Sequence, residues 1–142
     1  MATMPKWAQE LLLDACLAFG KEDVPDVMWR KAHRRVYQGW SRDIRVPAYT
    51  DTSGYAVPSQ NRITITAGTN RLDQKRALLH ELAHLLAGRG HSALFWDRAW
   101  ELYRWAEMPV RVIARREGAY RKGALLAYAR SRKSKEVKHD AY

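Results

Sequence analysis

The chain of 142 residues contains a single cysteine, Cys16, so it cannot form an intrachain disulfide. Its cysteine usage therefore gives no indication of an oxidising compartment, and any metal ion must be bound by histidine and carboxylate side chains. Cys16 stands at helical spacing from Leu12 and Phe19, which favours a small buried apolar residue over a reactive nucleophile.

The sequence also lacks a long hydrophobic run. No segment approaches the roughly 18 consecutive apolar residues that a membrane span requires, and the first residues lead into an amphipathic helix instead of a signal peptide. Hydrophobic residues nevertheless make up 46% of the chain and include six tryptophans, which is enough for one folded core. We therefore expect a soluble, cytoplasmic, monomeric protein that does not associate with membranes.

Acidic residues are few: 15 Asp and Glu stand against 25 Lys and Arg, a net charge of +10. Residues 110–142 carry ten of the basic residues and only three acids. A second basic group surrounds three aromatic residues: Arg30, Lys31, Arg34, Arg35, Arg42 and Arg45, with Trp29, Tyr37 and Trp40. Basic residues interleaved with aromatics suit contacts with the backbone and bases of single-stranded nucleic acid, whereas the alternative is a solubilising face. We expect DNA to be bound through this surface.

Hydrophobic periodicity and turn residues predict an α+β fold. Helices are expected at residues 5–19, 72–87 and 93–107, and another after Pro109. The run at 62–66 is the clearest strand because four successive positions are β-branched, and with residues 55–57 it reads as a hairpin. The stretch that begins at residue 26 is ambiguous, and a strand is the preferred interpretation. The expected architecture is a single domain at residues 1–130, with a short antiparallel sheet packed on the helix 72–87, and a disordered basic tail at 131–142.

The most informative motif is His80-Glu81-Leu82-Ala83-His84 on the predicted helix 72–87. Because an α-helix turns about 100° per residue, histidines four positions apart lie on one face and can bind the same ion. Glu81 then stands beside them, where it can act as a general base. This pattern is typical of zinc hydrolases.

A hydrolytic zinc site usually has three protein ligands and one open position, so a third ligand must come from elsewhere. His91 is preferred, because the break at Gly88 and Gly90 lets the chain turn back towards the helix. The alternatives are that His91 is a capping or surface residue and that Asp97 or Glu101 supplies the ligand. Asp97 and Glu101 are also candidates to accept hydrogen bonds from the metal-binding rings, although a solvated helix face is the preferred interpretation of both.

Glu81 favours a catalytic centre over a closed zinc site that only stabilises the fold, because a closed site has no use for a carboxylate beside an open position. The expected reaction is hydrolysis of a peptide bond by a metal-bound water, with Glu81 as general base and later as proton donor to the leaving amine. A donor to the oxyanion is also required; Tyr103, Tyr120 and several arginines are candidates. The second interpretation is a zinc-binding, nucleic-acid-binding or structural module without turnover.

Three stretches carry a resemblance to a known family: residues 62–68 (RITITAG), 78–86 (LLHELAHLL) and 90–96 (GHSALFW). Together they resemble the SprT-like (Spartan) and WLM zinc metallopeptidases, in which a strand leads into an HExxH helix, a glycine-containing turn and a third histidine before an aromatic pair. The resemblance covers about 35 residues, a quarter of the chain. The six residues between His84 and His91 disfavour the metzincins, and no cysteine-rich DNA-recognition module follows the motif.

The resemblance implies zinc on His80, His84 and His91, with Glu81 as the base. It also implies that the strand 63–66 is the sheet edge along which an extended peptide would lie. Similarity to proteases that act on DNA–protein crosslinks would connect the zinc site to the basic surface, with DNA-associated proteins as substrates.

Overall fold

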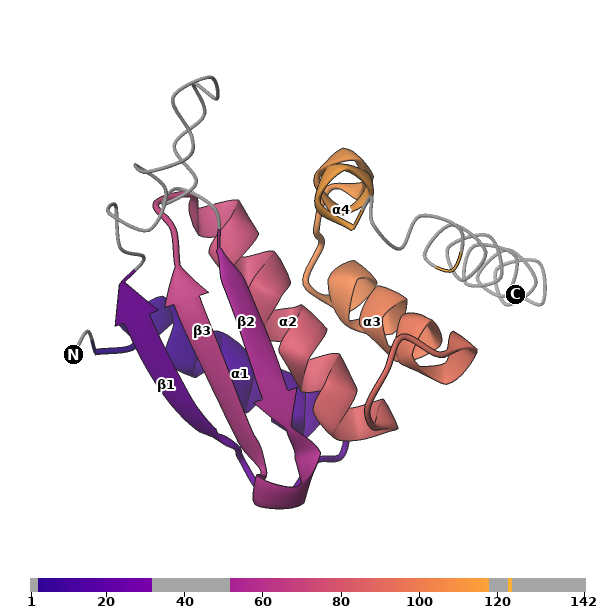
Figure 1. Cartoon of the computed structure of the whole chain (residues 1–142), viewed down its shortest axis with the longest axis horizontal. Helices are drawn as coiled ribbons and strands as arrows, with labels where there is room; N and C mark the ends of the chain where they lie inside the picture. Colours follow the sequence, from indigo (N-terminus) through magenta and orange to yellow (C-terminus); the bar gives the residue numbers. More distant parts are fainter. Residues whose placement is uncertain (1–2, 32–51, 118–122, 124–142) are drawn as a thin grey trace, which may run out of the picture.

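The computed structural model describes residues 3–31, 52–117 and 123 of the chain. The elements in these ranges are α1 (Lys6–Ala18), β1 (Asp26–Lys31), β2 (Ser53–Val57), η3 (Pro58–Gln60), β3 (Arg62–Ala67), α2 (Arg71–Ala87), α3 (Ala93–Trp105) and α4 (Val110–Arg116). The α+β class is confirmed (Figure 1). The three long helices each begin and end within two residues of their predicted bounds, and the ambiguous stretch after residue 25 is a strand. The end of the predicted domain at residue 130, the tail and most of the basic group at 30–45 lie outside the described residues.

The three strands form one sheet in the order β1-β3-β2. The predicted hairpin is present: β2 and β3 are antiparallel, with Tyr55 opposite Thr64. β1 is parallel to β3, with Asp26 opposite Arg62, so the sheet is mixed and the prediction of a purely antiparallel sheet is wrong in this respect. The two outer strands, β1 and β2, therefore run in opposite directions. The chain passes through β2 before it forms β3 in the centre of the sheet.

The sheet order also corrects the predicted sheet edge. The strand 63–66 belongs to β3, which is paired on both sides, so it cannot be the edge that receives a peptide. β2 has β3 on one side and no second partner strand among the described residues. The edge next to the HExxH helix is therefore β2.

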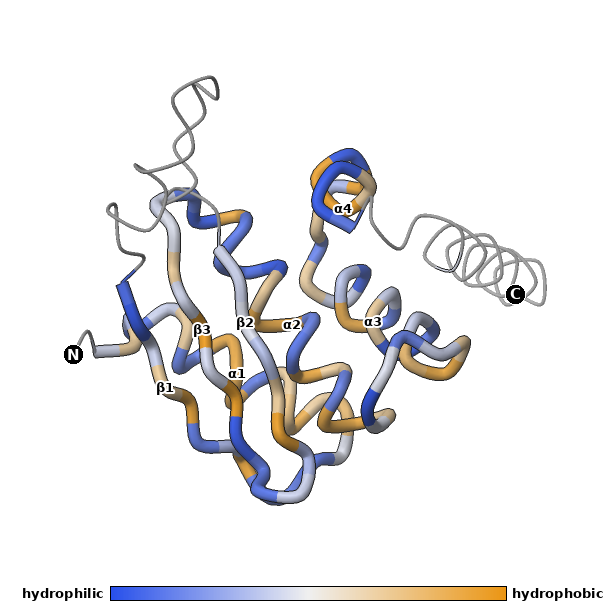
Figure 2. Tube along the Cα trace, in the orientation of Figure 1, coloured by the Kyte–Doolittle hydropathy of each residue, from blue (hydrophilic) through white to orange (hydrophobic). Residues whose placement is uncertain are grey.

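The core lies between the sheet and the helices α1 and α2, which Figure 1 shows on the same side of the sheet. Ile63 and Ile65 of β3 are buried in the same core as Leu78 and Leu82 of α2. Figure 2 shows apolar segments of β3, α1 and α2 in this region. Cys16 is buried in the same core, as its spacing predicted. In the described ranges no helix combines the length and apolar composition needed to cross a membrane.

α2 is set in place at both ends by local interactions. Asn70 caps its first turn by accepting a hydrogen bond of 3.0 Å from the Asp73 N–H. At the other end Gly88 has a φ of +95° and donates its N–H to the carbonyl of His84 at 2.7 Å. α3 then packs alongside α2, so the face of α2 next to the sheet and the face next to α3 are both covered.

Candidate metal centre

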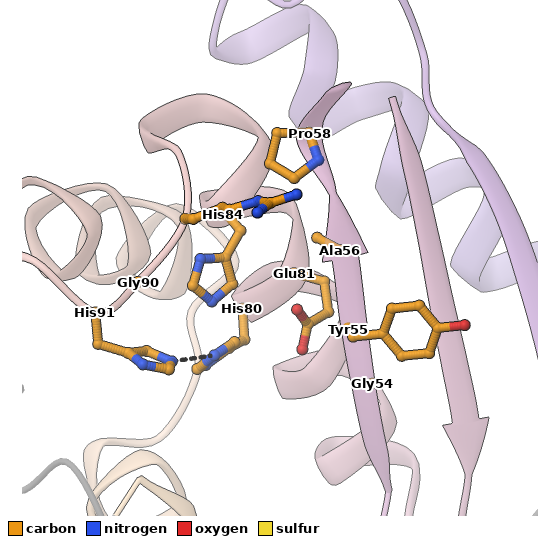
Figure 3. Close-up of a pocket in the computed structure, with 10 residues that line it drawn as sticks. Gly54, Tyr55, Ala56, Pro58, His80, Glu81, His84, Gly90 and His91 are labelled. Atoms are coloured by element: carbon orange, nitrogen blue, oxygen red, sulfur yellow. Dashed lines mark hydrogen bonds between the residues drawn. The ribbon is translucent and has the colours of Figure 1, made fainter. Parts of the chain in front are cut away.

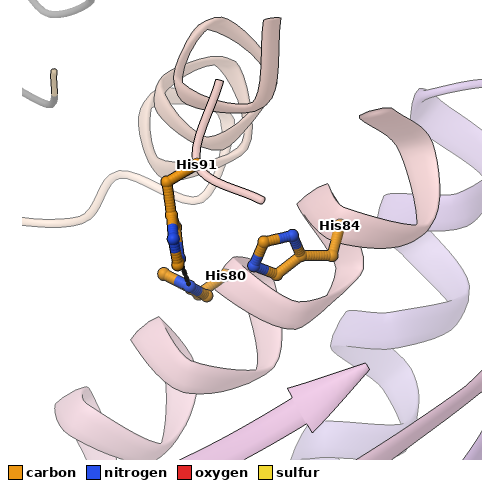
Figure 4. Close-up of side chains that lie close together, drawn as sticks. All are labelled: His80, His84 and His91. Atoms are coloured by element: carbon orange, nitrogen blue, oxygen red, sulfur yellow. Dashed lines mark hydrogen bonds between the residues drawn. The ribbon is translucent and has the colours of Figure 1, made fainter. Parts of the chain in front are cut away.

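α2 carries His80 and His84 on the face that turns towards the start of α3, and their ring centroids lie 5.2 Å apart. His91 approaches the pair from the loop between the two helices, with its centroid 5.3 Å from that of His80 and 4.9 Å from that of His84. The three rings each offer a nitrogen, and these nitrogens all lie within 4.8 Å of one another (Figure 4). The structure therefore brings together the three histidines that the sequence predicted.

The loop that returns His91 to α2 depends on two glycines. Gly88 and Gly90 have φ values of +95° and +81°, in the left-handed region that side chains with a Cβ rarely adopt. Ser92 then caps α3 by accepting a hydrogen bond of 3.2 Å from the Phe95 N–H. His91 thus lies between a glycine turn and a helix cap. The capping residue of α3 is Ser92, and His91, although exposed, joins the cluster with His80 and His84.

Hydrogen bonds fix which nitrogen of each helical histidine carries a proton. His80 Nδ1 lies 2.8 Å from a carboxylate oxygen of Glu117, and His84 Nδ1 lies 3.1 Å from the carbonyl oxygen of Gly88. A carboxylate or carbonyl oxygen can only accept, so both Nδ1 atoms donate. In the neutral rings the Nε2 atoms of His80 and His84 therefore keep their lone pairs for a metal ion.

One pair of the nitrogens has the spacing expected at a tetrahedral ion. His80 Nε2 and His91 Nε2 lie 3.3 Å apart. Two imidazole nitrogens bound to one tetrahedral zinc ion, each at about 2.05 Å, would be separated by about 3.3 Å. No fourth His, Cys, Asp or Glu joins the cluster among the described residues. The donor set therefore has the number of protein ligands typical of an open zinc site.

Aromatic side chains hold the imidazole rings on the side away from the sheet. Phe95 stacks on His84 with ring centroids 4.1 Å apart, and Trp96 stacks on His91 at 5.7 Å. Both aromatic residues are fully buried. They restrict the ring orientations and exclude water from one side of the cluster, which is the physical role of the Phe-Trp pair that follows His91 in the sequence.

The carboxylate that orients His80 is Glu117, a residue that the sequence did not single out. It stands at the end of α4, is 2% exposed, and also accepts a hydrogen bond of 2.6 Å from the Tyr103 hydroxyl. Burial alone would raise the pKa of Glu117, but its hydrogen bonds with His80 and Tyr103 and the charge of Arg76 lower it overall. Glu117 is therefore ionised and able to accept the His80 N–H.

Asp97 and Glu101, the candidate carboxylates for this role, lie on α3. Glu101 is exposed and pairs with Arg98 at 2.7 Å, one turn earlier on the same helix. The Nδ1 atoms of His80 and His84 bond to Glu117 and to the Gly88 carbonyl, and neither uses a carboxylate of α3. The structure likewise places His91, and not Asp97 or Glu101, as the third member of the cluster.

A buried ion network reaches the same carboxylate oxygen of Glu117 that accepts the His80 hydrogen bond. Arg76 lies between two carboxylates, 2.9 Å from Asp73 and 3.5 Å from Glu117. Asp73 also accepts the N–H of Thr52 at 2.8 Å and pairs with Arg116 at 3.2 Å. This network connects α2, α4 and the segment that precedes β2, so the position of Glu117 depends on the tertiary packing of all three.

Burial favours the neutral form of His84 and of His91. Desolvation lowers the pKa of His84 to about 4, although its hydrogen bond with the Gly88 carbonyl acts in the opposite direction. Burial and the neighbouring His80 also lower the pKa of His91. Both rings are therefore unprotonated at neutral pH, the state in which imidazole binds a metal ion.

Glu81 lies next to the histidines in an open cavity of about 360 Å³. Its side chain points into this cavity (Figure 3), although the residue as a whole is only 6% exposed. Burial raises the pKa of Glu81 to about 7, against the lowering influence of His80 and Arg76. A pKa near neutrality suits a group that must both accept and return a proton, and a divalent cation at the histidines would lower the pKa by favouring the carboxylate.

The cavity is bounded by β2 on the side opposite to the histidines. Gly54, Tyr55 and Ala56 line it, together with residues of α2 and the α2–α3 loop (Figure 3). A Cβ at Gly54 would lie 2.7 Å from the carbonyl oxygen of Thr64 and 3.3 Å from Glu81 Cγ. Glycine therefore allows the backbone of the edge strand to approach the carboxylate closely.

Two predicted oxyanion donors have different outcomes. Tyr103 is 1% exposed, does not line the cavity, and uses its hydroxyl to bond to Glu117, so it cannot reach a substrate. Tyr120 lies outside the described residues. The hydroxyl of Tyr103 thus has a supporting role at the metal centre and none in binding an oxyanion.

Comparisons with protein families, curated proteins and solved structures found no match for this chain. The resemblance to SprT-like peptidases therefore depends on the motif residues alone. Of what that resemblance implied, the structure confirms the grouping of His80, His84 and His91 beside Glu81. The chain has a possible metal site formed by three histidines, two of them on α2.

Proposed function

We propose that this chain is a zinc-dependent peptidase of SprT-like type. The observation that carries the proposal is the convergence of His80, His84 and His91 beside Glu81 at the wall of an open cavity. A site that only stabilised the fold would be closed by a fourth protein ligand. Here the cluster has three candidate ligands among the described residues and borders a cavity that can admit a substrate.

His80, His84 and His91 would hold the ion. A zinc ion bound there would supply Lewis-acid chemistry, acidifying a water molecule and polarising the carbonyl of the substrate. Glu81 accepts the proton of the attacking water on its carboxylate and returns it to the leaving nitrogen. The walls formed by Phe95 and Trp96 keep bulk water away from the other side of the rings.

β2 supplies the surface on which a peptide would lie. Among the described residues β2 is an edge strand that lines the cavity, and an extended peptide can add to such an edge by backbone hydrogen bonding. Gly54 places this edge close to Glu81. A peptide bound to β2 would thus lie with its backbone beside the proton-transferring carboxylate.

The test is cleavage by the zinc-loaded protein and by its Glu81→Gln variant, using unfolded casein and a mixture of short peptides. The parent protein should cleave, whereas Glu81→Gln should lose at least about 100-fold in rate because a general base is removed, and should keep one zinc ion. Glu101→Gln is the matched control, since Glu101 is an exposed carboxylate paired with Arg98. Equal cleavage by parent and Glu81→Gln would remove Glu81 from the mechanism. Zinc binding without any cleavage would favour the alternative of a non-catalytic module.

Action on DNA-associated proteins is the further part of the proposal. It rests on the net charge of +10 and on the two basic groups, most of which lie outside the described residues. Of the group around the three aromatic residues, Arg30 and Lys31 are described, at the end of β1.

A further inference from the structure

The cavity beside the histidines contains one permanently charged cation. Its described lining includes three histidines, the buried carboxyl of Glu81 and a single basic side chain, that of Arg89. The remaining lining residues carry no charge. Among the described residues, the guanidinium of Arg89 is therefore the one fixed positive charge of the protein that a substrate group meets in this cavity.

Arg89 is held beside the metal centre by the same turn that positions His91. It stands between Gly88 and Gly90, both with positive φ, and two residues before His91. A Cβ added to either glycine would have no neighbouring atom within 4 Å, so their role here is backbone conformation and not close packing. The turn that allows the third histidine to reach α2 also places a basic residue at the cavity.

The guanidinium of Arg89 has no hydrogen bond or ion pair with any residue in the described ranges. Other arginines near the site are used within the fold: Arg76 and Arg116 pair with Asp73, and Arg98 pairs with Glu101. An arginine has five N–H donors in a planar arrangement that matches a carboxylate in two parallel hydrogen bonds. Arg89 is thus an unoccupied donor group at the wall of the cavity.

We propose that Arg89 determines specificity by binding a carboxylate of the substrate, so that the site prefers acidic peptides. This inference rests on the proposed peptidase function, because it assigns the substrate class of the same cavity. Glu81 is the only acid in the described lining, and a divalent ion at the histidines would outweigh its charge. The carboxylate can belong to an Asp or Glu side chain or to the C-terminus of a peptide. Amidation of the C-terminus removes the preference in the second case and leaves it unchanged in the first.

Binding is measured in the zinc-loaded Glu81→Gln background, so that peptides are not consumed. The probes are fluorescein-labelled octapeptides of Ala, Ser and Leu in which one Glu or Gln is moved through the sequence, each with a free or an amidated C-terminus. One charge-assisted bidentate contact is worth roughly a tenfold change in affinity. We expect about tenfold tighter binding of a peptide with Glu at one position, or with a free C-terminus, than of its neutral counterpart.

Arg89→Gln should abolish this preference, and Arg89→Glu should reverse it towards peptides that carry Lys at the same position. Arg111→Gln is the control, because Arg111 is an exposed arginine of α4 that does not line the cavity. The inference would be overturned if the preference for acidic peptides survived Arg89→Gln. It would also be overturned if the Glu81→Gln protein showed no preference for acidic peptides or no measurable peptide binding.

Cleavage by the protein with Glu81 intact separates this inference from the peptidase proposal. Equal cleavage of acidic and neutral peptides would leave the peptidase proposal standing and remove the role of Arg89. Arg89-dependent binding of acidic peptides without cleavage by that protein would have the opposite meaning: the cavity would bind carboxylates, and the peptidase proposal would be wrong.

Discussion

Replacing Glu117 by glutamine should weaken zinc binding without removing any of the three proposed ligands. Glu117 accepts hydrogen bonds from His80 Nδ1 at 2.8 Å and from the Tyr103 hydroxyl at 2.6 Å. Glutamine has nearly the same size but no charge. The His80 ring would therefore lose a charge-assisted hydrogen bond that both orients it and increases the basicity of its Nε2 atom.

The expected size of this effect follows from the role of such partners. Changing a carboxylate that bonds to a metal-binding histidine typically costs 10- to 100-fold in metal affinity, so the dissociation constant for zinc should rise by about that factor, or about 1.4 to 2.7 kcal/mol. The substitution also leaves Arg76 and Arg116 opposite the single carboxylate of Asp73. Breaking a buried ion pair on one side costs roughly 3 kcal/mol or more of folding stability.

The two effects are separated by measuring zinc affinity on folded protein. Competition with a chromogenic chelator gives the dissociation constant, and circular dichroism identifies a temperature below the unfolding midpoint of the variant. Glu101→Gln, which removes an exposed carboxylate paired with Arg98, should leave the zinc affinity unchanged. A folded Glu117→Gln variant that binds zinc as tightly as the parent would refute the argument that Glu117 positions His80.

Three other predictions concern the cavity, its carboxylate and the basic surface. Gly54→Ala should lower the free energy of unfolding by roughly 1 to 3 kcal/mol in urea titrations, because the new Cβ would lie 2.7 Å from the Thr64 carbonyl oxygen; an unchanged midpoint would show that β2 can move away without cost. In metal-free protein the Glu81 carboxyl has a pKa raised to about 7, so the folded state binds a proton that the unfolded state releases above the ordinary pKa of 4.5. The parent should therefore lose stability relative to Glu81→Gln as the pH rises from about 4.5 to 7, by up to about 3 kcal/mol, and a pH-independent difference would contradict the raised pKa. Affinity for single- and double-stranded DNA should fall steeply between about 50 and 200 mM salt, as measured by fluorescence anisotropy, and salt-independent or absent binding would contradict a role for the basic residues.

The parts of the site that could be predicted from sequence are those set by local geometry. His80 and His84 share a face because of the helical repeat, and His91 is near in sequence across a glycine turn. Glu117 could not be found in this way, because it is 37 residues from His80 and approaches it only through the packing of α3 and α4. Hydrogen-bond partners of this kind are a property of the tertiary structure, and one acid among 15 in the sequence carries no local mark of the role.

The strands show the same division. The hairpin of β2 and β3 was predictable from its two short apolar runs and the turn between them. Which of the two strands would pair with β1 was not predictable. Three successive residues of β3, Ile63, Thr64 and Ile65, are buried. A run of buried residues that does not alternate with exposed ones is typical of a central strand. The unbroken β-branched sequence at these positions could have indicated a central strand. Gly54 and the exposed Tyr55 in β2 are in turn consistent with an edge.

The proposed function depends on the binding of one zinc ion by His80, His84 and His91. The most direct test is the metal content of the purified protein after dialysis against trace zinc, determined by inductively coupled plasma mass spectrometry in parallel with that of His91→Ala. We expect one zinc ion per chain in the parent. His91→Ala should contain less than one zinc ion per chain, because only the two histidines of α2 remain in its cluster. No zinc in the parent, or an equal content in both proteins, would contradict this expectation.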